Sequence, residues 1–340
     1  MGVTLTELAD RLNLSPMTVS RALRGVGRMQ PQTRQRVIET AREYGYRPNT
    51  SARAMRTGRS GCVALVLSSS VEHSTLPQQL VWGIEDAVEA QNAYLALCRL
   101  SDADVGQADR MPKLLKELVA DGLLLNYTHS VPKPLIEQIR TGHVPAIWIN
   151  TKMPHDCVFP DDVDAGYRLT KYLLDLGHRR IAYGDVYAPL RDEASAHYSV
   201  ADRRAGYLKA MAEAKLPPRE WRVPADDKRY TAAATQLLGG RDRPTAVVSY
   251  NGDTARPVME AAALLGLEVP RDLSVVSVDV GPIPMFDRWT TTLVLPEQEL
   301  GRTAVRMLLE KIANPTKKLP ATPVVGELLQ ADTTAPPPRK

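Results

Sequence analysis

The chain has 340 residues, of which 44% are hydrophobic and 24% are charged, a composition that indicates a globular protein with two or three folding units. No stretch approaches the roughly 18 unbroken apolar residues of a membrane span, and the polar N-terminus argues against a signal peptide, so we expect a cytoplasmic protein. The three cysteines, Cys62, Cys98 and Cys157, lie far apart in or beside apolar runs, which predicts buried thiols rather than disulfides or a metal site.

The positive charge is concentrated at the N-terminus. The net charge of the chain is +4, yet residues 1–60 hold eleven arginines against four acidic residues, a net charge of +7. The remaining residues carry 32 basic against 35 acidic side chains, a net charge of −3. A small basic unit at one end of the chain indicates a polyanion as its partner.

The N-terminal unit has the start signals of consecutive helices. Thr4 and Glu7 fit a capping box, in which the threonine hydroxyl accepts from the Glu7 backbone N–H, and apolar residues then recur at helical spacing up to Leu12. Ser15 can cap the next helix, and Pro16 suits its first position because the N–H that proline lacks would be unpaired there. The expected helices are residues 4–12, 16–23 and 31–44.

The second of these helices has a short polar face with one arginine. Val19, Ala22 and Leu23 face inward at helical spacing. The side chains left outward are Met17, Thr18, Ser20 and Arg21. Such a face suits a helix in the major groove of DNA. From these residues alone, a basic three-helix domain that binds a protein, or merely stays in solution, remains an alternative.

The N-terminal residues resemble the lactose-repressor/galactose-repressor (LacI/GalR) family of bacterial regulators. The residues that carry the resemblance are Val3, Thr4, Leu5, Leu8, Ala9, Leu14, Ser15, 18–23, Thr33, Arg34, Val37, 44–49, Ala52 and Arg53. The resemblance favours DNA as the partner. It implies an all-α helix-turn-helix headpiece with a hinge helix, followed by an α/β two-lobed periplasmic-binding-protein-like domain with two Rossmann-like parallel sheets.

The resemblance also implies the residues that contact DNA. Pro16 and Met17 would tune the operator sequence, and Arg21 would contact base edges. A guanidinium that is bidentate to guanine discriminates by roughly 1–3 kcal/mol, whereas Met17 offers only apolar contact, for example to a thymine methyl. Contacts to phosphates or base edges are implied at Thr4, Ser15, Thr18, Ser20, Thr33 and Asn49.

Residues 50–56 resemble the hinge helix of the family, which orders when two copies meet in the minor groove. Ala52 and Met55 would face that groove, with Met55 standing where the family usually has leucine. A plain interdomain linker is the alternative. The predicted domains are a headpiece at 1–47, a hinge and linker at 48–60, an effector-binding and dimerisation domain at 61–332, and a disordered tail at 333–340.

Short apolar runs alternate with helical patterns in the larger domain, which predicts parallel sheets with crossover helices. The expected strands are residues 63–67, 94–97, 123–125, 146–149, 181–183, 246–249 and 275–278. The resemblance implies two lobes that are discontinuous in sequence. The first lobe would take about 61–158 plus 290–318, and the second about 159–289 plus 319–332.

Four polar residues follow expected strands or adjoining loops: Asp162, Arg203, Asn251 and Asp279. Ligands of open parallel sheets lie beyond the carboxyl ends of the strands, so we expect all four in one cleft. By the resemblance, Arg203 and Asp279 would hydrogen-bond a small polar effector, with a sugar or sugar derivative as the favoured class. The alternative is that these side chains only cap strands and helices.

The cleft departs from the family pattern at Val163, Gly252, Val280 and residues 74–77. The usual aromatic wall is missing, so a stacking platform would have to come from Tyr187, Tyr250 or Trp289. These departures leave open an unusual effector, or none.

Nothing in the sequence supports an enzyme, a cofactor or a metal site. His178 is expected at a structural turn before a strand, and the other histidines lack metal-ligand spacing. The resemblance implies that leucine heptads at the C-terminus build tetramers, so their absence from the proline-rich tail favours a homodimer, which matches a pseudo-palindromic operator. The sequence thus predicts a transcriptional repressor. A cytoplasmic solute-binding module and a regulator that responds to a nucleobase or other non-sugar metabolite are the alternatives.

Overall fold

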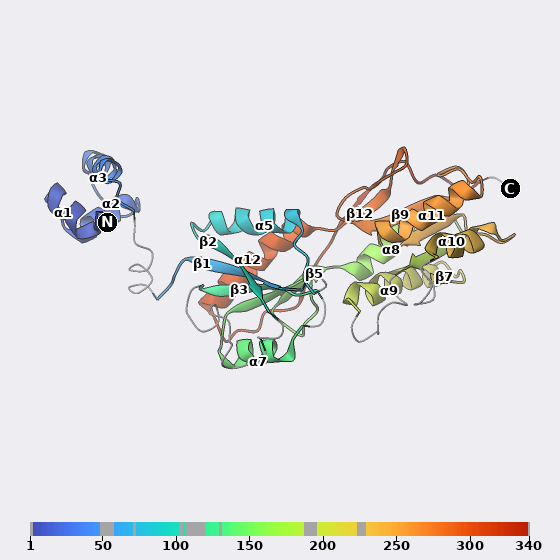
Figure 1. The fold of residues 1–340 in the computed structure, drawn as a ribbon, viewed down its shortest axis with the longest axis horizontal. Helices are drawn as coiled ribbons and strands as arrows, with labels where there is room; N and C mark the ends of the chain where they lie inside the picture. The colour runs from blue at the N-terminus through green and yellow to red at the C-terminus, as the bar shows by residue number, and fades with distance from the viewer. Residues whose placement is uncertain are drawn as a thin grey trace. The chain divides into compact units, whose positions relative to one another are not determined.

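The structure, a computed structural model, is drawn in Figure 1. It describes residues 3–47, 58–70, 73–101, 105, 120–128, 131–186, 196–222 and 229–338. The chain divides into two compact units, Met1–Gly61 and Cys62–Lys340. The predicted hinge helix lies outside the described residues, so its ordering stays a prediction.

The first unit is a three-helix headpiece, as predicted. Its helices are α1 (Leu5–Leu12), α2 (Pro16–Leu23) and α3 (Pro31–Glu43). Thr4 and Glu7 form the expected capping box, and Asn13 takes the left-handed conformation with φ 56° in the turn that follows. Ser15 caps α2 by accepting from the Thr18 N–H at 3.1 Å. The helices surround one small core of Leu8, Ala9, Leu12, Val19, Ala22, Val37 and Ala41.

The second unit contains two six-stranded sheets with helices on both faces. The first sheet, with its helices, forms the first lobe, and its strand order is β13-β5-β4-β3-β1-β2, parallel throughout. Its strands are β1 (Cys62–Ser68), β2 (Tyr94–Leu100), β3 (Gly122–Asn126), β4 (Ala146–Ile149), β5 (Cys157–Pro160) and β13 (Thr322–Val324). Helices α5 (Gln78–Glu89) and α12 (Glu297–Ala313) cover one face and α7 (Lys133–Thr141) the other (Figure 1).

The second sheet, with its helices, forms the second lobe, and its order is β14-β12-β9-β8-β6-β7. It is parallel except at β14, which runs antiparallel to β12. Its strands are β6 (Ile181–Asp185), β7 (Arg219–Arg222), β8 (Ala246–Ser249), β9 (Ser274–Asp279), β12 (Thr291–Val294) and β14 (Glu327–Leu329). Helices α8 (Asp162–Asp175) and α9 (Tyr198–Glu213) cover one face, and α10 (Tyr230–Gly239) and α11 (Gly252–Leu264) the other. A small hairpin of β10 (Pro284–Met285) and β11 (Arg288–Trp289) follows β9.

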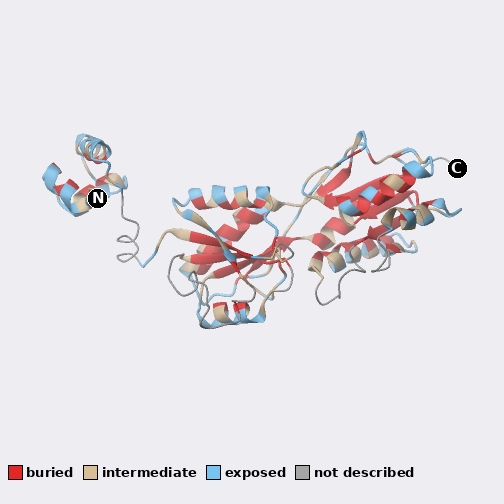
Figure 2. Ribbon diagram, in the orientation of Figure 1, coloured by how far each residue is buried: buried red, intermediate tan, exposed pale blue. Residues whose placement is uncertain are grey.

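The apolar runs predicted as strands are confirmed. Helices on both faces bury most of them from end to end, but β2 at the edge of its sheet is half-exposed, with Tyr94 60% and Leu97 58% exposed. In β1, for example, every residue after Cys62 is buried. Figure 2 shows the buried residues gathered in the strands of both sheets.

The predicted lobe boundaries are wrong at both crossings near the C-terminus. Residues 291–294 form β12, which pairs with β9 in the second lobe, although we assigned them to the first. Residues 322–324 form β13, which pairs with β5 in the first lobe, and Leu319 lies in that lobe's core. Strands of three or four residues carry no pattern that identifies their sheet. The sheet that offers each of them a neighbouring strand decides it.

The prediction of a disordered tail at 333–340 is also wrong as far as Pro338, the last described residue. Thr333 is fully buried, its hydroxyl donates to Val275 O at 2.6 Å, and its carbonyl accepts from the Val275 N–H at 2.9 Å. Ala335 O accepts from His178 Nε2 at 2.9 Å. Extended backbone that finds hydrogen-bond partners at the start of strand β9 is held despite its proline content.

Two smaller predictions, on the cysteines and on His178, have different outcomes. The three cysteines form no disulfide, but only Cys157 is buried, whereas Cys62 and Cys98 are half-buried. His178 is buried beside Thr245 and Ser274, at the end of the sheet where strand β6 begins. In the part of the chain that the structure describes, no helix is both long and apolar enough to cross a membrane.

Candidate functional site

The headpiece presents the predicted recognition face on α2. Val19 and Ala22 are buried against the other helices, which turns the opposite side outward. Met17 is 62% exposed on that side, and the exposed side chain of Arg21 makes no hydrogen bond to any described residue. Both side chains are therefore available to a partner along one face of a single helix.

Several other predicted DNA contacts have a local role within the headpiece. Thr4 and Ser15 cap α1 and α2, and the Thr18 hydroxyl lies 2.8 Å from that of Ser15. Capping hydroxyls sit at the helix N-termini, where the backbone N–H groups attract a phosphate. Pro16 is exposed, and Ser20 and Thr33 are half-buried. Asn49, Ala52 and Met55 lie outside the described residues.

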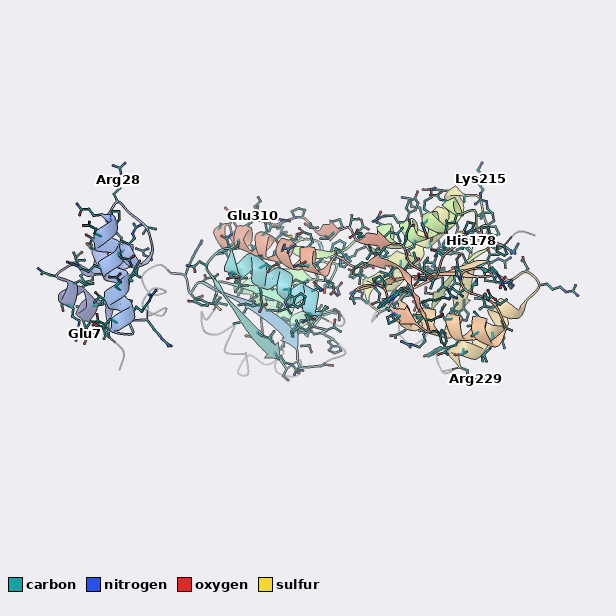
Figure 3. All side chains as sticks on the ribbon, turned by 90° about the horizontal axis from the view of Figure 1, so that it is seen from above. Glu7, Arg28, His178, Lys215, Arg229 and Glu310 are labelled. Atoms are coloured by element: carbon teal, nitrogen blue, oxygen red, sulfur yellow. The ribbon has the colours of Figure 1, made fainter. Side chains whose placement is uncertain are left out.

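The arginines of the headpiece fall into two groups. Arg34 donates to Gly27 O at 3.1 Å and Arg36 to Leu12 O at 3.0 Å, so they hold the turns between helices. Arg11 lies over the Tyr44 ring at 4.4 Å. Arg28 is exposed in the turn between α2 and α3 and points away from the helices (Figure 3). The basic unit predicted from the sequence therefore has arginine side chains that face the solvent, such as Arg28.

The second unit holds a cavity of about 380 Å³ between its two lobes, at the carboxyl ends of the strands. The residues that line it are Thr75, Thr128, Asn150, Pro160, His197, Ser199, Val200, Arg203, Tyr250, Asn251, Val278, Asp279 and Leu295. Three of the four predicted effector residues are therefore brought together, namely Arg203, Asn251 and Asp279.

Arg203 projects from α9 and is 6% exposed. Its Nε donates to Asp162 Oδ1 at 2.6 Å, its Nη1 donates to Tyr250 O at 2.7 Å, and the guanidinium lies 4.5 Å above the Tyr250 ring. Burial lowers the pKa of Arg203, but the adjacent Asp162 carboxylate and Tyr250 outweigh this effect and leave the pKa raised. The cavity therefore has a fixed cation in its floor.

The prediction that Asp162 contacts the effector needs correction. The residue is 1% exposed and does not line the cavity. Oxygen Oδ1 accepts from Arg203, and Oδ2 is buried without a hydrogen-bond partner among the described residues. Asp162 begins α8 directly behind Arg203, so it positions the guanidinium.

Asn251 and Asp279 both combine a capping role with a place in the cavity wall. Asn251 Oδ1 accepts from the N–H and the hydroxyl of Thr254, each at 3.0 Å, and so caps α11. This fixes the orientation of the amide. Asp279 Oδ2 accepts from the Gly252 N–H at 3.0 Å, and Oδ1 from the Val280 N–H at 2.8 Å. Each carboxylate oxygen can accept a further hydrogen bond.

Two departures from the family pattern have a physical reason in the structure. A Cβ at Gly252 would lie 2.1 Å from Ile283 Cδ1 and 3.0 Å from Asp279 Oδ2, so any larger residue here requires the Ile283 side chain to move. Ser74 Oγ accepts from the Ser68 N–H at 2.8 Å and donates to Asn126 O at 2.6 Å, which joins the ends of β1 and β3. Nothing in the structure explains Val163 or Val280.

The structure also tests the candidate aromatic platforms. The Tyr250 ring is covered on one face by Arg203, and burial raises the pKa of its hydroxyl. Trp289 lies on β11, 53% exposed, and does not line the cavity. Tyr187 lies outside the described residues.

The sequence prediction missed the His197 and Ser199 side of the cavity. His197 caps α9 by accepting from the Ser199 N–H, and its Nε2 faces Asn150 O of the first lobe at 3.0 Å. Tyr198 packs edge-on against Phe159 with ring centroids 5.7 Å apart. The sequence signal that could have found this site is a histidine directly before a helical pattern. Composition alone does not distinguish such a histidine from an ordinary helix cap.

Comparisons with known proteins agree with both units. Residues 4–49 match the family described as bacterial regulatory proteins, lacI family, and residues 170–333 match the periplasmic binding protein-like domain. The HTH-type transcriptional repressor PurR of Escherichia fergusonii is 29% identical, with 98% of this chain and 97% of PurR covered.

Solved structures share the fold. The lac repressor dimer bound to operator and the anti-inducer ONPF has a TM-score of 0.71 at 24% identity, with 98% of this chain and 100% of that chain covered. A LacI family regulator from Mycobacterium smegmatis has a TM-score of 0.60 at 27% identity, with 81% and 99% covered. With a matching headpiece, a matching larger domain and a likeness to PurR repressors over nearly its whole length, the chain belongs to the LacI/GalR family of bacterial transcriptional regulators.

Proposed function

We propose that the protein is a repressor that binds a pseudo-palindromic operator as a homodimer and is controlled by a small polar effector in the cavity between its lobes. It acts on DNA in the cytoplasm and catalyses no reaction. The observation that carries the proposal is the α2 face, where exposed Met17 and Arg21 stand side by side on a capped helix. A helix with such a face reads base edges in the major groove.

The assignment of roles follows from side-chain chemistry. Arg21 reads a guanine through two parallel hydrogen bonds, and Met17 contacts a thymine methyl. Thr4, Ser15, Thr18, Ser20, Thr33 and Asn49 contact phosphates or base edges, with Pro16 beside them at the start of α2. Ala52 and Met55 enter the minor groove from the hinge segment.

The cavity supports an effector that both donates and accepts hydrogen bonds. Arg203 donates from the floor, and Asp279 accepts at the wall. Asn251 has its Oδ1 engaged by Thr254, so its amide nitrogen is left for a ligand. A sugar or sugar derivative meets this pattern best. A nucleobase is the second candidate class, favoured by the full-length likeness to PurR repressors.

The deciding experiment is selection of bound fragments from genomic DNA by the purified protein, repeated with Arg21→Ala. We expect the wild type to enrich a palindrome and Arg21→Ala to lose preference at one guanine of each half-site, with a cost of about 1–3 kcal/mol. Arg28→Ala is the matched control, because Arg28 lies in the turn beyond the recognition helix.

The control should weaken binding to all sequences and leave the palindrome unchanged. Enrichment of no sequence by the wild type would contradict sequence-specific recognition. An unchanged palindrome with Arg21→Ala would contradict the assignment of Arg21.

A further inference from the structure

Two side chains of the second lobe contact the first lobe beside the cavity, without lining it. Tyr198 is the first residue of α9, yet its ring packs against the core of the first lobe, edge-on to Phe159 with ring centroids 5.7 Å apart. Asp202, one turn further along α9, pairs with Lys152 in the segment between β4 and β5 of the first lobe. We call Lys152, Phe159, Tyr198 and Asp202 the clasp.

The Lys152 ammonium group lies at the centre of the clasp. Its Nζ donates to Asp202 Oδ2, and it lies over the Phe159 and Tyr198 rings, 5.2 Å from each centroid. An ammonium group is attracted to the face of an aromatic ring by the ring quadrupole. One cation of the first lobe is therefore held by a carboxylate and an aromatic ring of the second lobe.

The clasp is shielded from water more than an ordinary surface ion pair is. The side chains of Lys152 and Asp202 are 38% and 18% exposed, whereas those of Lys171 and Asp175, an ion pair within α8, are 49% and 62% exposed. Solvent screens exposed pairs most, so the pair in the clasp contributes more.

A hydrogen bond adds a second polar link between the lobes at the same place. The Tyr198 hydroxyl donates to Asn150 Oδ1 at 3.2 Å. Tyr198 thus contacts the first lobe through its ring and through its hydroxyl. Because apolar, aromatic and ionic contacts coincide here, separation of the lobes must break all of them together.

We propose that the clasp holds the two lobes together and sets the balance between a closed and an open arrangement of the lobes. Every group in the clasp belongs to the protein, so closure needs no contact with an effector. Arg203, the cation of the cavity, follows Asp202 directly in α9, so opening of the clasp moves a cavity residue as well. The effect on operator binding rests on the proposed function, in which the cavity between the lobes controls the repressor.

Hydroxyl-radical footprinting of the full-length protein tests the clasp, because it measures how readily solvent reaches each side chain. Phe159 is the reporter, since it is only 9% exposed in the closed clasp and is not itself changed. We expect Lys152→Met and Asp202→Asn to raise its rate of modification about fivefold, which corresponds to about 1 kcal/mol in the opening equilibrium. A rate equal to that of the wild type would overturn the proposal.

Two controls separate opening of the lobes from other effects. Lys171→Met breaks the ion pair within α8, so Phe159 should keep its wild-type rate. Tyr207 is fully buried in the core of the second lobe and should stay protected in every variant. A rise at Tyr207 as well would refute the clasp as the contact that is lost, because the whole lobe would then be loosened.

Exchange of the two charges tests the ion pair itself. We expect the double variant Lys152→Asp with Asp202→Lys to return the Phe159 rate toward that of the wild type, because the opposite charges meet again. A side chain that acts only by filling space gives no such rescue. A double variant that is no better protected than the single variants would show that the ion pair does not close the lobes.

Operator affinity is measured on the same preparations by fluorescence anisotropy. We expect the single clasp variants to change the affinity and Lys171→Met to leave it as in the wild type. A wild type that binds no operator would refute the proposed function and leave the footprinting result in place. Clasp variants that open and still bind operator like the wild type would refute the regulatory role of the clasp alone.

Discussion

The Asp162–Arg203 pair shows how burial changes what an ion pair contributes to the free energy of unfolding. Both side chains are less than 10% exposed, at 1% and 8%. Asp162→Ala leaves the guanidinium buried without its counter-ion, and we expect a loss of about 3–5 kcal/mol in the free energy of unfolding, measured by urea denaturation.

The control for this prediction is Asp164→Ala on the same helix. Asp164 pairs with Arg168 at 3.3 Å, but these side chains are 30% and 35% exposed, so we expect a loss below about 1 kcal/mol. Similar losses for the two variants would show that burial does not distinguish the pairs.

Glu297, at the start of α12, predicts a pH dependence of stability. Burial, and secondarily the Asp279 charge, raise the pKa of Glu297 from 4.5 to about 7. Between these two values the folded state binds more protons than the unfolded state, so stability falls as the pH rises from about 4.5 to 7. The urea midpoint of unfolding, measured across this pH range, should depend less on pH in Glu297→Gln than in the wild type. Glu299 is exposed on the same helix, so Glu299→Gln should keep the pH dependence of the wild type.

Residue identities could be predicted from the sequence where a motif or a strand end marks them. Arg203, Asn251 and Asp279 were found this way because strand ends converge. His197 was not, because its place in the cavity wall depends on a contact with Asn150, which lies 47 residues earlier in the chain and in the other lobe. Asp162 shows the opposite error. Its position after a strand was predicted correctly, but the sequence did not reveal that the Arg203 side chain covers it.

At the scale of elements, the contact between α8 and α9 sets the position of Arg203. A Cβ at Gly206 would lie 2.1 Å from Val163 O, and one at Gly166 would lie 2.0 Å from Arg203 O. Gly206→Ala must push the helices apart, and we expect a loss of about 1–3 kcal/mol in the free energy of unfolding.

Gly239→Ala is the matched control, because a Cβ there would meet nothing closer than 4.0 Å at the end of α10. Alanine should be neutral or stabilising at that position by up to about 1 kcal/mol. Chemical denaturation of both variants measures the two changes in the free energy of unfolding. A Gly206→Ala variant as stable as the wild type would mean that the helices adapt without cost.

Elements could be predicted where their local pattern is long enough. The headpiece helices carry caps that act within four residues, and the central strands are buried runs flanked by helical patterns. Strands β13 and β14, of three residues each, carry no such pattern. Their sheets are chosen by tertiary contacts, so the sequence could not assign them to a lobe.

At the scale of the whole molecule, the charge of the headpiece predicts strong salt dependence of operator binding. A protein that makes six to ten phosphate contacts loses roughly 10³–10⁵ in affinity between 50 and 200 mM salt, because counterions are released. We expect a loss of this order in a fluorescence-anisotropy titration, with a slope reduced by about 1 in Arg28→Ala. An affinity that hardly changes with salt would contradict an arginine–phosphate interface.

The two lobes are joined where the chain crosses after β5, after β12 and between β13 and β14. As a consequence, neither lobe corresponds to one continuous stretch of the gene. A contiguous coding segment that carries one whole lobe must therefore also carry part of the other, whereas the headpiece, confined to the first 61 residues, can be exchanged intact. Operator preference can thus change by gene shuffling more readily than the effector cavity, which evolves by substitution in place.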